Sequence, residues 1–319
     1  MTTNQLNEIL KHPTNAEVIR EAARSQNTRT AYNKSWKCYT DWCSNDGIDP
    51  LQASADDIVR FFVTMGHEGT TGKKPLSLNT LKIIRSALND KWCRLGQPSP
   101  AAEKIVDELF RGLARIMGQN QRRVKALREY QVLAMLQLCG KRLHGLRDAA
   151  VLSLGFSAAL RRSEICNLRV DDLVGECQEG LTLIVRRSKT DQTGLGQSIA
   201  VIQGQIIRPV EHLQRWLNAS KIEDGYLFQT IMKGGVVSGL PIDAGDVALL
   251  VKRYAKRIGL DPKNYSGHSL RAGFVTSAAS HQARIDKIME VTRHKNAESV
   301  FKYIRDEDSF KDHAGSSFL

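Results

Sequence analysis

The spacing of apolar residues changes once along this 319-residue chain, at the polar and basic segment GQNQRRVKALRE (118–129). Before this segment, apolar residues recur every three or four positions, which is the spacing of amphipathic helices. After it, helical stretches are interrupted by two short alternating apolar runs around the turn-like sequence DQTGLG (191–196), a strand–loop–strand pattern. The sequence therefore predicts a helical domain over 26–117, a linker over 118–129 and a mixed domain over 130–319. The polar residues 1–25 are expected to form a flexible arm.

The first domain contains four recognisable helical patterns and no strand alternation. One runs from Thr28 to the Asp46-Gly47 break, and the next two open at Ser54 and Ser77, which suit helix N-caps. A fourth extends from about Ala101 to Met117. We expect a small bundle of four or five helices.

The second domain is predicted to be mostly helical, with a small antiparallel sheet. The two strands are expected within LTLIVRRSKT and QSIAVI, and helices are expected on both sides of them. The predicted fold class of the whole chain is therefore mainly α, with one mixed α/β domain.

The charge balance points to a polyanionic partner. Lys and Arg total 46 against 34 Asp and Glu, a net charge of +12. Such an excess fits nucleic-acid binding, and it also fits a protein whose charge serves only solubility. Six scattered cysteines without a CxxC pair favour a reducing compartment, and the longest nearly apolar run, 149–160, is too short for a membrane span. We expect a cytoplasmic protein with no membrane partner.

Metal and nucleotide sites are not predicted. The segment from Gly66 to Lys74 resembles a phosphate-binding loop, but the spacing of its glycines is one residue too long and a helix precedes it. The sequence has no HExxH motif and no obvious carboxylate cluster for a divalent metal. We therefore expect no cofactor.

The candidate chemistry lies in a set of basic residues and one tyrosine in the second domain. Each alone is typical of a surface or core position, but their order and spacing are specific. They are Arg161 in LRRSEI, Lys189 in RSKT, His268 and Arg271 in HSLR, His294 in RHK, and Tyr303 nine residues later in YIR.

In this order the motifs resemble those of the tyrosine recombinases, the phage-type integrases, and most closely the two-domain Cre-like members. The resemblance extends over roughly residues 25–310. Two positions depart from common patterns: Ala158-Ala159 replaces the Thr-Gly of many members, and His294 stands where Cre-like members carry Trp.

The resemblance implies a C-shaped DNA clamp, with a SAM-like core-binding domain followed by the catalytic domain. It also implies metal-free cleavage through a 3′-phosphotyrosyl intermediate formed by Tyr303, and residue chemistry agrees. Arg161 and Arg271 suit the developing phosphorane charge as permanently charged forked donors. The remaining roles are Lys189 as general acid, His268 as proton acceptor, His294 as a further phosphate donor, and Glu164 as a residue that orients Arg161 or His268.

DNA contacts are expected from helix faces of the first domain and from the linker, although a solvated helix face would look the same. The candidates are Arg29, Lys34, Asn79, Lys82, Arg85, Arg122 and Arg123. The resemblance implies an inverted-repeat site that binds a dimer, and a homotetramer on two sites, with the tail after Tyr303 docking in a neighbouring protomer. The alternatives are a type IB topoisomerase-like enzyme and a non-catalytic DNA-binding regulator.

Overall fold

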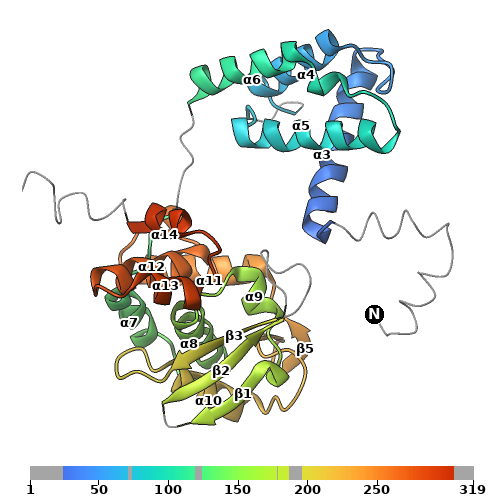
Figure 1. The fold of residues 1–319 in the computed structure, drawn as a ribbon. Coiled ribbons are helices and arrows are strands. Elements are labelled where there is room, and N and C mark those ends of the chain that lie inside the picture. Colours follow the sequence, from blue (N-terminus) through green and yellow to red (C-terminus); the bar gives the residue numbers. More distant parts are fainter. Residues whose placement is uncertain (1–23, 71–73, 119–123, 178, 187–195, 305–319) are drawn as a thin grey trace, which may run out of the picture. The chain divides into compact units, whose positions relative to one another are not determined.

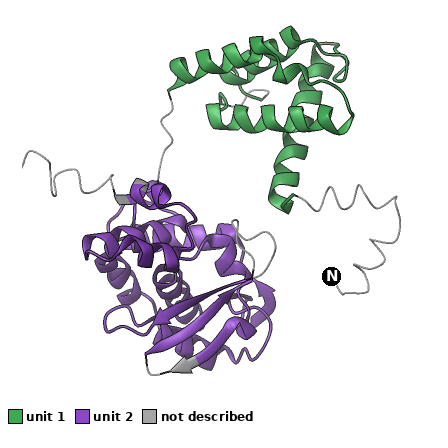
Figure 2. Ribbon diagram, in the orientation of Figure 1, with its two compact units in different colours: residues 1–121 green, residues 122–319 purple. Residues whose placement is uncertain are grey.

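The computed structural model describes residues 24–70, 74–118, 124–177, 179–186 and 196–304. The chain divides into two compact units, an N-terminal unit (1–121) and a C-terminal unit (122–319), which Figure 2 colours separately. Each unit has its own hydrophobic core. The fold is mainly helical with two small antiparallel sheets, so the predicted fold class is confirmed.

The described part of the N-terminal unit is entirely helical (Figure 1). Its elements are α3 (Gln26–Asn45), α4 (Ala55–His67), α5 (Leu78–Arg94), the 3-10 turn η2 (Pro100–Ala102) and α6 (Lys104–Met117). Ser54 and Ser77 cap α4 and α5 as predicted. The first helix begins before the predicted Thr28 because Ser25 is its N-cap, and α6 begins after the predicted Ala101 because η2 precedes it.

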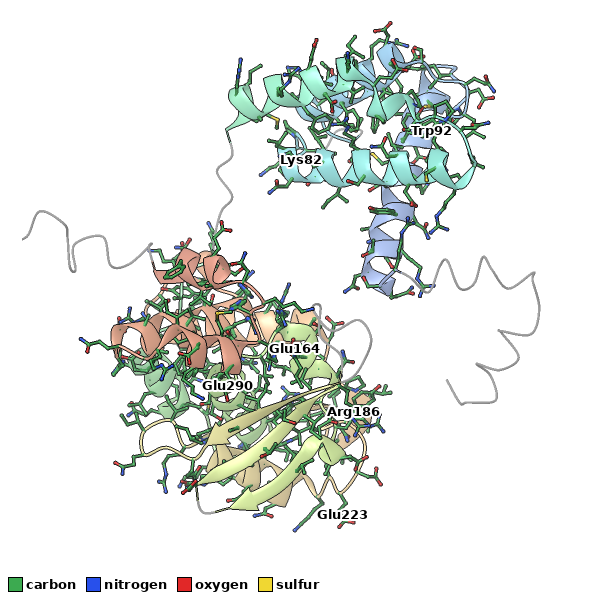
Figure 3. The ribbon with its side chains drawn as sticks, in the orientation of Figure 1. Lys82, Trp92, Glu164, Arg186, Glu223 and Glu290 are labelled. Atoms are coloured by element: carbon green, nitrogen blue, oxygen red, sulfur yellow. The ribbon has the colours of Figure 1, made fainter. Side chains whose placement is uncertain are left out.

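Aromatic side chains hold the helices of this unit together. The Tyr39 ring lies 5.2 Å from that of Phe61 and 5.9 Å from that of Trp92, in edge-on geometries that favour aromatic pairs. Trp92, labelled in Figure 3, is almost completely buried. Aromatic residues from α3, α4 and α5 therefore form the centre of this core.

The C-terminal unit combines helices with a three-stranded and a two-stranded sheet (Figure 1). Its elements are α7 (Glu129–Gln137), α8 (Leu143–Ser157), α9 (Arg162–Asn167), η3 (Val170–Asp172), β1 (Leu173–Cys177), β2 (Gly180–Val185), β3 (Gln197–Ile202), α10 (Pro209–Ser220), β4 (Gln229–Ile231), β5 (Val237–Pro241), α11 (Ala244–Arg257), η4 (Pro262–Asn264), α12 (His268–Ser280), α13 (Ile285–Thr292) and α14 (Ala297–Ile304). Helix α8 is buried on nearly all sides and packs against α10 and α12, which explains its nearly unbroken apolar sequence.

The larger sheet has the order β1-β2-β3 with both pairs antiparallel. The strand–loop–strand prediction is confirmed for β2 and β3. Strands β1, β4 and β5 were not predicted, because they are short and two of them contain a glycine at positive φ, Gly175 and Gly239, which interrupts the alternating pattern.

Residues 124–128, which belong to the segment expected to be a linker, pack into the C-terminal unit. The Leu127 N–H donates to the Ser269 carbonyl at 3.0 Å, and the Leu127 side chain is fully buried. A Cβ added at Gly273 would lie 1.8 Å from the Leu127 carbonyl oxygen. The glycine on α12 therefore allows this close approach of two backbones.

No helix among the described residues is both long enough and apolar enough to cross a membrane.

Candidate active site

The turn between α8 and α9 positions Arg161 and Glu164. Arg161 is the N-cap residue of α9, and its backbone N–H donates to Glu164 Oε2 at 2.8 Å. Its side chain also donates, from Nη1 to Glu164 Oε1 at 2.7 Å. Glu164, labelled on α9 in Figure 3, has a side chain only 1% exposed. Of its two expected roles, the hydrogen bonds support the orientation of Arg161.

Arg271 lies one helical turn after His268 on α12 and is 1% exposed. Its Nη1 donates to the Ala159 carbonyl at 2.7 Å, and its Nη2 donates to the Thr292 carbonyl. Burial, and then the nearby positive charge of Arg161, lower the pKa of Arg271 to about 9. The guanidinium is therefore charged at neutral pH and is anchored by carbonyls from two separate segments.

A third arginine, Arg293, joins this group and was not among the sequence candidates. It is 6% exposed, and its Nη2 donates to Glu164 Oε2 at 2.7 Å. The only sequence signal was its position beside His294, because nothing in the local pattern shows that its side chain is buried. Its hydrogen bond to Glu164, a residue 129 positions away in the sequence, places it in the site.

His268 and Tyr303 face each other from α12 and α14. The distance between His268 Nε2 and the Tyr303 hydroxyl is 2.7 Å, which is a hydrogen bond. The half-buried Tyr303 packs against the small apolar cluster of Val275, Ile288 and Val300, which joins α12, α13 and α14. Apolar packing of α12, α13 and α14 therefore brings the tyrosine to the histidine.

Burial is the main reason that the pKa of His268 lies below its ordinary value, and the positive charges of Arg271 and Arg161 lower it further. The ring is consequently neutral at pH 7. A neutral imidazole whose Nε2 lies 2.7 Å from a phenol can accept the phenolic proton.

His294 follows the left-handed residue Arg293, and its ring centroid lies 6.1 Å from that of Tyr303. The Thr292 hydroxyl lies 2.7 Å from the Ile288 carbonyl and 2.8 Å from His294 Nδ1. A carbonyl can only accept, so the single hydroxyl proton points to Ile288, and His294 Nδ1 must carry the proton that it shares with Thr292. The neutral ring therefore presents Nε2 as an acceptor.

The structure describes some of the remaining candidate residues and leaves others out. Lys189, Arg122 and Arg123 lie outside the described residues. Lys34, Asn79 and Lys82 are exposed on α3 and α5, and Arg29 is partly buried on α3. DNA contacts at all of these positions remain predictions.

Arg85 has a structural role within the N-terminal unit. Its Nη2 lies 2.5 Å from Asp107 Oδ1, its Nε donates to the Ala101 carbonyl at 2.8 Å, and its guanidinium lies over the Phe110 ring. This side chain links α5 to α6 and is less available for DNA than the neighbouring Lys82.

No group of three or more potential metal ligands among His, Cys, Asp and Glu occurs in the part of the chain that the structure describes.

Residues 125–309 match the family model described as the phage integrase family. The chain belongs to the phage integrase family. Within it, the chain is 33% identical to the integrase/recombinase xerD homolog of Selenomonas ruminantium over 301 residues, 92% of this chain and 86% of that protein. It is 25% identical to the tyrosine recombinase XerA of Pyrococcus horikoshii over 291 residues, 91% of this chain and 90% of the relative.

Solved structures of a site-specific recombinase and a transposon integrase share the fold. A XerH site-specific recombinase bound to palindromic difH substrate matches with a TM-score of 0.64 and 14% identity, covering 99% of this chain and 89% of that one. The Tn1549 transposon integrase in complex with transposon right end DNA matches with a TM-score of 0.61 and 17% identity, covering 90% and 92%. At these identities the likeness concerns the fold. The family match and the two relatives confirm, at the level of the family, the resemblance of the sequence motifs to the tyrosine recombinases.

Proposed function

We propose that this protein is a site-specific DNA recombinase that cleaves and rejoins DNA through Tyr303. The observation that carries the proposal is the hydrogen bond between His268 Nε2 and the Tyr303 hydroxyl, beside Arg161 and Arg271. A tyrosine has an ordinary pKa near 10, so a neutral histidine in contact with it supplies the proton acceptor that a phenol nucleophile needs.

In the proposed cleavage step, the Tyr303 oxygen attacks the scissile phosphorus and its proton passes to His268. The bond between phosphorus and the 5′-oxygen breaks, and a 3′-phosphotyrosyl bond forms. Lys189, which lies outside the described residues, would protonate the departing 5′-oxygen. Rejoining is the reverse reaction, with a 5′-hydroxyl as the nucleophile and Tyr303 as the leaving group.

Arg161 and Arg271 bind the scissile phosphate in this proposal. Each terminal nitrogen of Arg271 carries two protons, and one from each is used by the Ala159 or Thr292 carbonyl, which leaves further protons for phosphate oxygens. Arg161 keeps an 18% exposed side chain while Glu164 holds it. Loss of one such preorganised donor is expected to slow cleavage by about 10²–10³-fold.

The proposal extends to assembly as a Cre-like enzyme. We expect a dimer on an inverted-repeat site, a homotetramer on two sites, DNA contacts from both units, and docking of the tail after Tyr303 in a neighbouring protomer. The net charge of +12 supports binding to DNA. The family relationship supports recombination over both alternatives, a type IB topoisomerase-like activity and a non-catalytic regulator.

The decisive experiment uses a nicked suicide substrate, which traps the covalent intermediate, and compares wild-type protein with Tyr303→Phe. The Phe variant should bind the substrate with unchanged affinity and form no covalent adduct on a denaturing gel. Tyr130→Phe is the matched control, because Tyr130 is 62% exposed on α7 and should keep full activity. A covalent adduct with the Tyr303 variant would show that another residue is the nucleophile.

The assembly is tested separately by titration of a half-site and of the complete inverted repeat in a band-shift assay. Cooperative binding to the repeat supports the recombinase. Relaxation of supercoiled DNA that carries no such repeat, without cooperative binding, would favour the topoisomerase.

A further inference from the structure

The corner between α13 and α14 is built on an arginine in an unusual backbone conformation. Arg293 is the C-cap residue of α13, with φ of 57°. This left-handed backbone conformation is disfavoured for residues other than glycine. Glycine commonly occupies positions of this kind at helix C-termini. A reason for arginine here must therefore lie in its side chain.

That side chain is also placed at a cost to stability. The guanidinium is 2% exposed, and its Nε and Nη1 are buried without a hydrogen-bond partner in the described part of the protein. Burial lowers the pKa of Arg293, which reflects the unfavourable environment of the charge. A residue whose backbone conformation and side-chain burial both cost stability is expected where function requires it.

The contacts of Arg293 reach the supports of both phosphate-binding arginines. Its Nη2 donates to Glu164 Oε2 at 2.7 Å, while Arg161 Nη1 donates to the other oxygen of the same carboxylate. The same Nη2 lies 3.4 Å from the Ala159 carbonyl, which also accepts from Arg271. One guanidinium thus touches the acceptor that holds Arg161 and the acceptor that holds Arg271.

We propose that Arg293 is a positioning residue that aligns Arg161 and Arg271 for the phosphate, through the Glu164 carboxylate and the Ala159 carbonyl. This proposal rests on the function proposed above. Arg293 itself is not assigned a contact with DNA. Its effect is transmitted because a carboxylate held by two guanidinium groups keeps one rotamer, and Arg161 takes its direction from that rotamer.

The charge of Arg293 also affects how cleavage depends on pH, through the pKa of His294. Burial lowers the pKa of His294 most, and the positive charges of Arg271, Arg161 and Arg293, together with His268 once it is protonated, lower it further. Tyr303 also lies beside the His294 ring, and Lys295 and Glu290 line the same surface hollow as His294. Removal of the Arg293 charge should therefore raise the pKa of His294 and shift the pH profile of cleavage toward higher pH.

The test measures single-turnover cleavage of the suicide substrate by Arg293→Gly, together with DNA affinity and thermal unfolding. Glycine suits the left-handed corner, so the variant should fold and should bind DNA within about threefold of wild type. Its cleavage should slow by about 10–100-fold, as expected when a supporting contact is lost. Arg293→Lys should recover part of the rate, because it returns a positive charge near Glu164.

Lys221→Gly is the matched control. Lys221 is an exposed residue that also ends a helix, α10, with φ of 57°, so this change relieves the same backbone conformation without touching the site. It should leave cleavage unchanged.

A double-mutant cycle separates positioning from general structural support. If Arg293 acts through Arg161, the effects of Arg293→Gly and Arg161→Lys on the cleavage rate should be strongly non-additive. Wild-type cleavage, additive effects, or a loss that only follows the unfolded fraction would overturn the proposal. Formation of the covalent adduct by the wild-type protein in the same assay tests the proposed function itself, so the two failures are distinguishable.

Discussion

His294 must gain a proton before it can donate to a phosphate. Thr292 uses its only hydroxyl proton on the Ile288 carbonyl, at 2.7 Å, so Nδ1 of His294 holds the single proton of the neutral ring. Nε2 can donate only in the imidazolium. Replacement of His294 by Trp tests this directly, because an indole N–H donates without a charge.

The size of the effect follows from the pKa of His294, which burial and the charge of Arg271 lower to about 4. Protonation of His294 at pH 7 is therefore unfavourable in the free protein. A hydrogen bond from a charged donor returns about 1.5–3 kcal/mol. Contact with phosphate should therefore raise the pKa of His294 by about 1–2 units, to about 5–6.

The direction in which DNA affinity changes with pH follows from proton linkage. The pKa of His294 is lower in the free protein than in the complex, so DNA binding takes up a proton, and affinity increases as pH falls. The change should be confined to the interval between the two pKa values. From pH 6 to pH 5, affinity should rise about 2–5-fold in wild type, with little change above pH 6.5.

The assay is fluorescence anisotropy with a half-site oligonucleotide at constant salt, in a Tyr303→Phe background that prevents cleavage. Constant salt is essential because phosphate contacts make affinity strongly salt-dependent. His294→Trp should lose the part of the pH dependence that His294 contributes, while titration of His268 remains in both proteins. Identical pH dependence of the two proteins, or no proton uptake by calorimetry at pH 5.5, would refute the reasoning.

Two further predictions concern cleavage without a metal ion and the close approach of the Gly273 and Leu127 backbones. Cleavage and rejoining should continue in excess EDTA, because the proposed steps use only side chains, and loss of cleavage that magnesium restores would contradict the mechanism. Gly273→Ala should lower the free energy of unfolding by about 3 kcal/mol or more, measured by denaturant or thermal unfolding, since the new Cβ would overlap backbone atoms of Leu127. Gly112→Ala, within α6 and with open space at its Cβ, is the control and should stabilise the protein by about 0.5–1 kcal/mol. Equal effects of the two changes would show that the Leu127 segment can move away.

Much of the architecture was readable from local sequence. The N-caps at Ser54 and Ser77 and the three-to-four-residue apolar spacing depend on neighbours within one or two turns, so they can be recognised without tertiary information. The same holds for β2 and β3, in which buried apolar residues alternate with more exposed residues along each strand. The ordered motifs from Arg161 to Tyr303 also carried the family relationship, because side-chain chemistry at fixed spacing is specific when several motifs occur together.

Tertiary structure decided how these side chains meet. The pairing of Arg293 with Glu164 joins residues 129 positions apart, and Arg271 reaches a carbonyl 112 positions away. In the N-terminal unit, the ion pair of Arg85 with Asp107 links two helices, which its sequence context did not indicate, and a DNA contact at Arg85 stays a prediction. Sequence determined which groups are available for the chemistry, whereas burial and long-range packing decided which arginine is supporting, which histidine faces the tyrosine, and where each proton lies. The physical reason is that pKa values and hydrogen-bond partners depend on neighbours brought together by the fold, and local spacing carries little information about them.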